Sequence, residues 1–168
     1  MKWHELVAAS GSSEAMALWA RLWALECAYW DDVDFNHGEH APQFYTEEGL
    51  FDIGVPGSRM KGREAIARFY ASRKAVGRRT TLHLVANFTL VEWGAEQAMT
   101  RSIMSLYGAD GAPPQTSAVP IMTAVSANAY VRAREAQWQV SERVFTPCFT
   151  DEDGLPLRRI RDHDASQG

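Results

Sequence analysis

Residues 80–93 read TTLHLVANFTLVEW, a segment rich in the β-branched and aromatic side chains that favour a strand. The segment is too long for a loop, and Gly94 ends it. Three further segments of the same kind follow, at residues 97–107, 119–133 and 137–145. Strands that are joined in order by turns form an antiparallel meander. Because these strands exceed the usual length of about five or six residues, we expect the sheet to twist and to curve strongly.

The first half of the chain has the apolar spacing and the end signals of helices instead. Three segments show them, at residues 12–34, 38–45 and 62–76. The hydroxyl of Ser12 and the acid of Glu14 are typical of a helix start. Residues 50–53 and 59–61 flank a Pro-Gly turn and predict a small hairpin between the second and third helices. We expect the helices to lie on the hollow side of the sheet and to close a cup.

The size and composition of the chain are those of one globular domain. It has 168 residues, of which 46% are hydrophobic and 23% are charged, and a domain usually has about 100–200 residues. We expect one α+β domain over residues 13–147, with residues 1–12 as an N-terminal extension and residues 148–168 as a polar tail.

Charge and hydropathy exclude several classes of partner. The net charge is -4, whereas a nucleic-acid groove needs clustered positive charge. No segment approaches the roughly 20 apolar residues of a membrane span, and the start MKWHELVAASGSS lacks the apolar centre of a signal peptide. His37 and His40 have no third ligand nearby, so they are weak evidence for a metal site. We therefore expect a cytoplasmic protein without a metal, a nucleic-acid partner or a membrane partner.

The strand at residues 80–93 has two unlike faces. Alternation places His83, Val85 and Asn87 on one face, and Leu82 and Leu84 on an apolar opposite face. A pocket wall with a few polar groups has the pattern of the first face, and so does the solvent side of a sheet, so both interpretations stay open. An exposed apolar face favours association, so we expect a helix or a partner subunit to cover it. We predict a homodimer or a higher homo-oligomer.

Charged residues near the helix end and on the last strand could carry chemistry. Asp31, Asp32 and Asp34 end the first helix, where acids oppose the helix dipole, so at least one of them could have a use besides solvation. If Asp34 lies near His83, its carboxylate would fix the tautomer of the imidazole and raise its basicity, as in a general base. Arg143 on the last strand would stabilise an anion if it pointed into a cavity, although a lone strand arginine is usually at the surface.

Five motifs occur in an order that resembles a known family. They are a first helix ending in Tyr29 and Asp34, then FYTEEG at 44–49, KGREAI at 61–66, TLHLVAN at 81–87 and WQVSER at 138–143. Over about residues 13–147 this series resembles the SnoaL-like branch of the NTF2-like superfamily. The resemblance implies a cone in which three N-terminal helices pack on a strongly curved antiparallel sheet and enclose an apolar pocket.

The resemblance also implies roles for single residues. In the dehydratase-like members an Asp at the end of the first helix pairs with a His on the first long strand, and Asp34 and His83 match these positions. Tyr29 matches a tyrosine of bile-acid 7α-dehydratase, and Arg143 matches a pocket arginine of a hexachlorocyclohexane dehydrochlorinase. Residues 97–107 offer no clear counterpart to the second acid or His that some members use.

The function implied is that of a cofactor-free lyase or isomerase, similar to dehydratases and ketosteroid isomerase, acting on a small cyclic and mostly apolar substrate. His83 would abstract a proton, Asp34 would orient it, and Tyr29 and Arg143 would bind the developing oxyanion or the leaving group. The residues expected to line the substrate pocket are Trp30, Val85, Asn87 and Asn128. Two alternatives stay open: a non-catalytic protein that binds a small apolar or polycyclic ligand, and a structural subunit like the small subunit of ring-hydroxylating dioxygenases.

Overall fold

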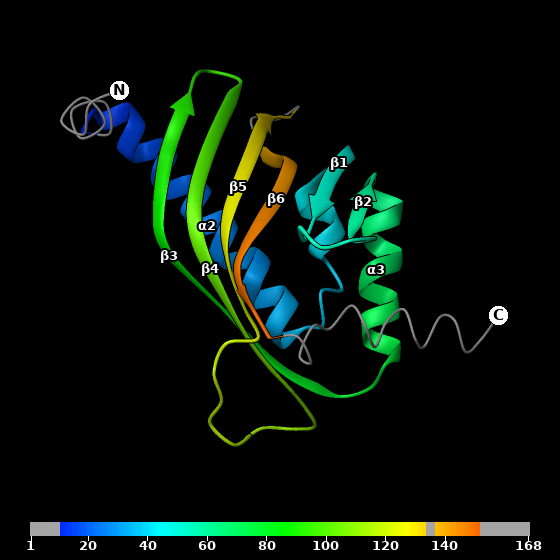
Figure 1. Cartoon of the computed structure of the whole chain (residues 1–168). Coiled ribbons are helices and arrows are strands. Elements are labelled where there is room, and N and C mark those ends of the chain that lie inside the picture. Colours follow the sequence, from blue (N-terminus) through cyan, green and yellow to red (C-terminus); the bar gives the residue numbers. More distant parts are fainter. Residues whose placement is uncertain (1–10, 134–136, 152–168) are drawn as a thin grey trace.

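Four long strands form most of a curved sheet in the computed structural model, which describes residues 11–133 and 137–151 (Figure 1). The strands are β3 (Arg79–Trp93), β4 (Gln97–Asp110), β5 (Met122–Arg132) and β6 (Trp138–Thr150). Each pairs antiparallel with the next along the chain, which is the predicted meander. The sequence predicts a tail from residue 148, whereas β6 continues to Thr150. Residues 152–168 and most of the expected N-terminal extension lie outside the described residues.

Two shorter strands complete the sheet at one edge. They are β1 (Tyr45–Asp52) and β2 (Arg59–Lys61), and the strand order is β2-β1-β6-β5-β4-β3. β1 pairs with β2 as the predicted hairpin, but it runs parallel to β6, so the expectation of a wholly antiparallel sheet is wrong. A parallel pair needs a long connection, and α3 and the other long strands lie between β1 and β6 in the chain.

Two α-helices and one short 3-10 helix precede the meander in the described residues. They are α2 (Ser13–Phe35), η1 (Ala41–Phe44) and α3 (Arg63–Ala75). The Ser12 side chain accepts a hydrogen bond from the backbone N–H of Ala15 and so begins α2 where the sequence predicts. The predicted second helix is only the single turn η1. His37 and Gly38 have positive φ angles of 59° and 72°, which turn the chain, and Tyr45 already belongs to β1.

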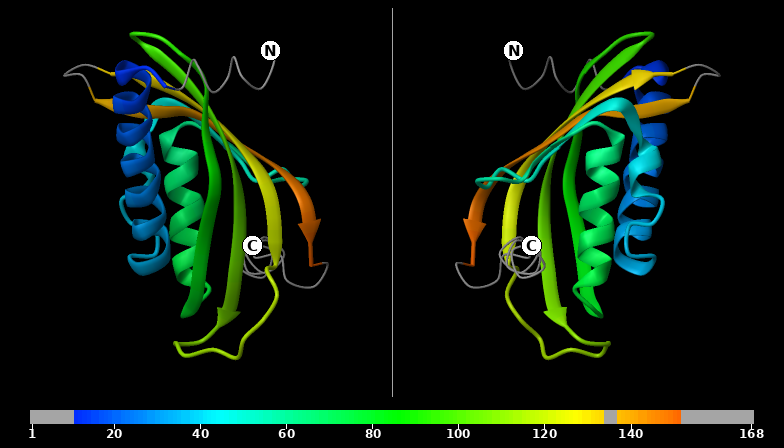
Figure 2. Two further views of the ribbon diagram at one scale, coloured as in Figure 1. Left: turned by 90° about the vertical axis from the view of Figure 1, so that its left-hand side faces the viewer. Right: turned by 90° about the vertical axis from the view of Figure 1, so that its right-hand side faces the viewer.

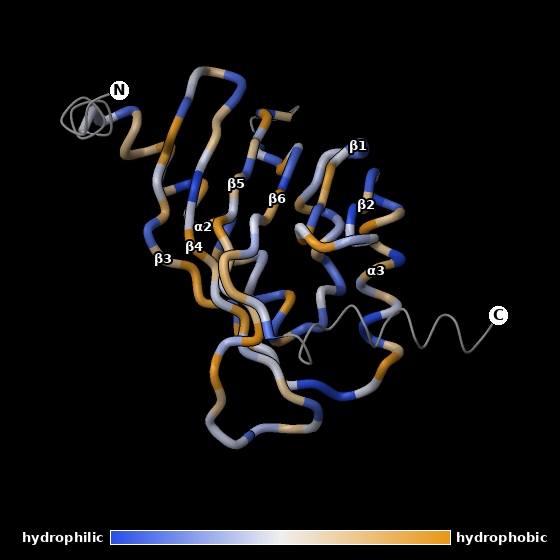
Figure 3. Tube along the Cα trace, viewed as in Figure 1, coloured by the Kyte–Doolittle hydropathy of each residue, from blue (hydrophilic) through white to orange (hydrophobic). Residues whose placement is uncertain are grey.

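Both α-helices lie on the same side of the sheet, and the sheet bends around them (Figure 2). Hydrophobic residues recur along the long strands (Figure 3). The buried core lies between the helices and the sheet and includes Leu22, Ile66, Met104, Tyr130 and Val140. No helix in the described ranges is both long enough and apolar enough to cross a bilayer.

The two faces of β3 have opposite environments. Thr81 is buried and the His83 side chain is 6% exposed, whereas Leu82 and Leu84 are 44% and 55% exposed. The face with the polar groups therefore points toward the helices, and the apolar face is open in this single chain. A bulge follows Ala86, so the alternation of the strand does not continue beyond it.

Candidate active site

The last turn of α2 brings Asp34 against β3. Its Oδ1 atom lies 2.6 Å from Nδ1 of His83, and its Oδ2 atom accepts the backbone N–H of His83 at 2.7 Å. The Thr81 hydroxyl also donates to Oδ1 at 3.0 Å. Both side chains of the pair are almost fully buried. A carboxylate held in this way favours the tautomer with the proton on Nδ1, which leaves Nε2 as the nitrogen that can accept a proton.

The surroundings of His83 favour the neutral imidazole. Burial lowers the pKa of His83 below its ordinary value of 6.5, Asp34 opposes this shift, and the charges of Arg73 and Arg143 add to it. The indole of Trp30 stacks on the imidazole, with ring centroids 4.0 Å apart and planes inclined by 17°. Burial and the two arginine charges thus favour the neutral form of His83, and Asp34 and Trp30 fix the orientation of its ring.

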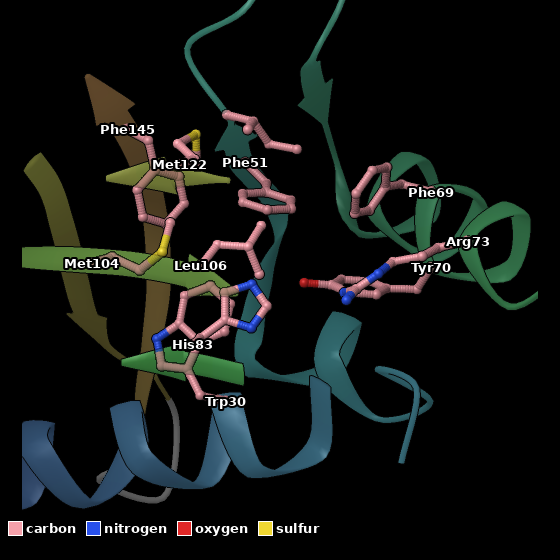
Figure 4. A pocket seen from close by; sticks show the side chains of 11 residues that line it. Trp30, Phe51, Phe69, Tyr70, Arg73, His83, Met104, Leu106, Met122 and Phe145 are labelled. Atoms are coloured by element: carbon pink, nitrogen blue, oxygen red, sulfur yellow. The ribbon is translucent and has the colours of Figure 1, made fainter. Parts of the chain in front are cut away.

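A small apolar cavity of about 50 Å³ adjoins the imidazole (Figure 4). The residues that line it are Trp30, Phe51, Ile53, Phe69, Tyr70, Arg73, His83, Met104, Leu106, Met122 and Phe145. Sites that enclose a drug-sized ligand have about 300–1,000 Å³, so a polycyclic compound does not fit the cavity as it stands. Met104 and Met122 have flexible side chains that adapt to irregular shapes, so this wall can yield to a ring-sized ligand.

Three tyrosine hydroxyls form a chain that ends at the cavity. The Tyr29 hydroxyl bonds to the hydroxyls of Tyr45, at 3.0 Å, and of Tyr70. Tyr70 lines the cavity, whereas Tyr29 lies behind it with no exposed surface. Burial holds the pKa values of Tyr29 and Tyr70 well above 10, so both are neutral hydrogen-bonding groups. Tyr70, which no sequence motif points to, is thus the tyrosine that a ligand in the cavity would meet.

Arg143 lies in the core and not at the cavity wall. Its two terminal nitrogens donate to the two carboxylate oxygens of Glu26, each at 2.7 Å, and its guanidinium lies 4.0 Å from the centroid of the Tyr29 ring. Glu26 also accepts the indole N–H of Trp30 at 2.8 Å. Arg143 is expected to contact an oxyanion in the cavity. In the structure its guanidinium is bound by Glu26 instead and does not line the cavity. A lone acid within an apolar helix is the sequence signal for such a partner.

The other expected pocket residues lie in three different places. Asn128 is buried within the sheet and bonds to Ser126 and Tyr130. Val85 borders a surface groove between α2 and β3. Asn87 is exposed at the bulge with a φ of 53°, a conformation that Asn tolerates better than most residues. Of the four expected pocket residues, Trp30 alone lines the described cavity.

Comparison with known proteins connects this geometry to a family. A family model for the SnoaL-like domain matches residues 17–144. No curated protein matches the chain significantly.

Similar solved structures share the fold at low sequence identity. One is described as a putative scytalone dehydratase from Novosphingobium aromaticivorans, with 16% identity, a TM-score of 0.71 and coverage of 83% of this chain and 90% of that one. ActVI-ORFA from Streptomyces coelicolor has 13% identity, a TM-score of 0.68 and coverage of 78% and 98%. A Catenulispora acidiphila protein in complex with S-DNPA has 14% identity, a TM-score of 0.66 and coverage of 77% and 94%.

Proposed function

Because the chain belongs to the SnoaL-like family, we propose that it is a lyase or isomerase that needs no cofactor and acts on a small cyclic substrate. The single observation that carries the proposal is the buried Asp34–His83 pair beside an apolar cavity. A base with this orientation and a lowered pKa suits the removal of a proton from carbon next to a carbonyl group.

In the proposed reaction His83 takes the proton through Nε2. The C–H bond breaks, and its electron pair moves toward the neighbouring carbonyl to give an oxyanion. Asp34 stabilises the imidazolium that forms. Tyr70 donates its hydroxyl proton as a hydrogen bond to the oxyanion. In an isomerisation the carbonyl re-forms as another carbon takes the proton back from the imidazolium. In an elimination the carbonyl re-forms, a carbon–carbon double bond forms, and the leaving group departs with the electron pair of its own bond to carbon.

Tyr29 and Arg143 act behind the cavity in this proposal. The hydroxyls of Tyr29 and Tyr70 are bonded to each other, and in the proposed reaction Tyr29 is the donor, which leaves the Tyr70 proton for the oxyanion. The guanidinium of Arg143 lies over the Tyr29 ring and helps to hold that ring in place. Both are positioning residues, whereas the family resemblance implies that they touch the substrate.

The test uses His83→Ala and Asp34→Asn against a panel of enolisable single-ring ketones and acids. Loss of a placed base lowers turnover by about 10²–10⁴-fold. The matched control is His40→Ala, because His40 also pairs with an aspartate, Asp32 at 3.0 Å, but is 57% exposed. Undiminished turnover in both the His83 and the Asp34 variant would refute the proposed roles.

A binding protein without catalysis is the second candidate. The residues that line the described cavity include no carboxylic acid and no second imidazole that could protonate a leaving group. This composition favours isomerisation over elimination if the protein is an enzyme, and it equally suits a ligand carrier. Ligand binding without turnover across the panel would favour the carrier.

We also propose a homodimer that covers the open face of the sheet. Leu82 and Leu84 on β3 and Met99 and Ile103 on β4 are large hydrophobic residues that are each more than a third exposed. Such a set on neighbouring strands is typical of an association surface.

A further inference from the structure

Arg73 is the one arginine or lysine among the described residues that line the cavity. It lies near the end of α3, one turn after Tyr70. Figure 4 shows the Arg73 guanidinium and the Tyr70 hydroxyl both extending from α3 toward His83. The cavity therefore has one polar end in an otherwise apolar wall.

The hydrogen bonding of Arg73 leaves much of its capacity unused. One terminal nitrogen donates to the Thr81 hydroxyl at 3.1 Å. The neighbouring cations Lys74 and Arg79 form ion pairs with Glu39 and Asp110, whereas no carboxylate in the described part of the chain lies within ion-pair distance of Arg73. A guanidinium has five N–H donors in a planar fork that matches the two oxygens of a carboxylate.

The apolar wall makes this charge more effective than it would be in water. Phe51, Phe69 and Leu106 surround the same space, and attraction between opposite charges grows as the local dielectric constant falls. The charge of Arg73 also acts at the His83 end of the cavity, because it lowers the pKa of His83, as burial does.

We propose that the ligand of this cavity is a small single-ring carboxylate, whose carboxylate group binds Arg73 while its ring contacts the apolar wall. The inference rests on the proposed function, because it takes the cavity as the substrate site. The proposed ligand is thus an anion with a single ring, whereas the sequence predicts a mostly apolar or polycyclic ligand. The carboxylate would also hold the ring in a fixed orientation relative to Nε2 of His83.

The experiment compares the binding of benzoate and benzyl alcohol at neutral pH by isothermal titration calorimetry. Arg73→Met removes the charge and keeps the length of the side chain, and Arg73→Lys keeps the charge. The matched control is Arg68→Met, because Arg68 lies on the same helix but is 73% exposed and outside the cavity lining. Thermal unfolding followed by circular dichroism checks that each variant folds.

We expect wild type, Arg68→Met and Arg73→Lys to prefer benzoate. Arg73→Met should weaken benzoate binding by about 10- to 100-fold, the range for a hydrogen bond to a charged group, and should leave benzyl alcohol binding unchanged. Equal affinity of wild type for both probes, an unchanged preference in Arg73→Met, or no binding of either probe at millimolar concentration would overturn the inference.

Binding and turnover separate this inference from the proposed function. His83→Ala keeps Arg73, so it should keep the preference for benzoate while it loses turnover. A preference that persists in a His83→Ala variant with full turnover would count against the proposed catalysis alone. Loss of turnover in His83→Ala without any preference for benzoate in wild type would count against the inference alone.

Discussion

Replacing Glu26 by Gln tests the buried ion pair on which the helical side of the site depends. Arg143 and Glu26 have 0% and 1% exposed side chains, and two hydrogen bonds of 2.7 Å join them. The glutamine amide keeps the size of the side chain but removes its charge, so the guanidinium loses its counter-ion in the core. Removal of one partner of a buried pair costs about 3–5 kcal/mol.

The expected change is large enough for a simple assay. For a chain of this length each kcal/mol shifts the unfolding midpoint by about 2–4 °C, so we expect Tm to fall by about 6–20 °C. Urea unfolding of wild type and variant, at the same pH, gives the free-energy difference directly.

A double variant separates the charge from the packing. Glu26→Leu with Arg143→Met replaces the pair by apolar side chains and should recover most of the stability that Glu26→Gln loses, since such replacements are often neutral or stabilising. A loss of less than about 1 kcal/mol in Glu26→Gln, which is the range of an exposed pair, would refute the reasoning. So would a double variant that is no more stable than the single one.

Three further predictions concern the base, the tyrosines and the open sheet face. Because the pKa of His83 is lower in the folded state than its ordinary value of 6.5, the stability that His83 contributes is complete above pH 6.5 and is lost as the pH falls toward the folded-state pKa. Urea unfolding at several pH values should show this loss in wild type and not in His83→Gln. The same pH dependence in both proteins would contradict the prediction. Tyr70→Phe should lower kcat by about 10²–10³-fold, and Tyr29→Phe should lower it less with KM unchanged; an equal or larger loss in Tyr29→Phe would reverse the two roles. Leu84→Glu places a charge on the open face of β3 and should convert the dimer to a monomer in light scattering, whereas a wild type that is already monomeric at micromolar concentration would remove the basis of this prediction.

The sequence predicts most of the fold, because its signals are periodic and local. The strands of the meander and both α-helices follow from the spacing of apolar residues and from capping by Ser12. The parallel pairing of β1 with β6 has no local signal, since it joins residues far apart in the chain. The predicted second helix is shortened by the positive φ angles of His37 and Gly38, which spacing does not reveal.

The candidate site is less predictable than the fold. From the residues alone the contact of Asp34 with His83 is only a conditional expectation, and it is the resemblance to the SnoaL-like family that implies the pair. Asn87 follows the same alternation in the sequence, but the bulge carries it to the surface. Tyr70 and Arg73 give no sequence signal of a site, because the position of α3 in the folded chain decides which of its residues reach the cavity.

Gly38 lets the helical wall of the cavity pack tightly, which leaves the sheet wall as the one that can adapt. A side chain at this position would place its Cβ atom 2.2 Å from Cδ1 of Tyr70, so the glycine allows α3 to approach the loop after α2 closely. The hydroxyl bond between Tyr70 and Tyr29 joins α3 to α2 itself. The helical wall is therefore braced at two points, and Met104 and Met122 on the sheet side are the yielding part. We expect a ligand to be admitted by rotamer changes of these thioethers and not by a movement of the helices.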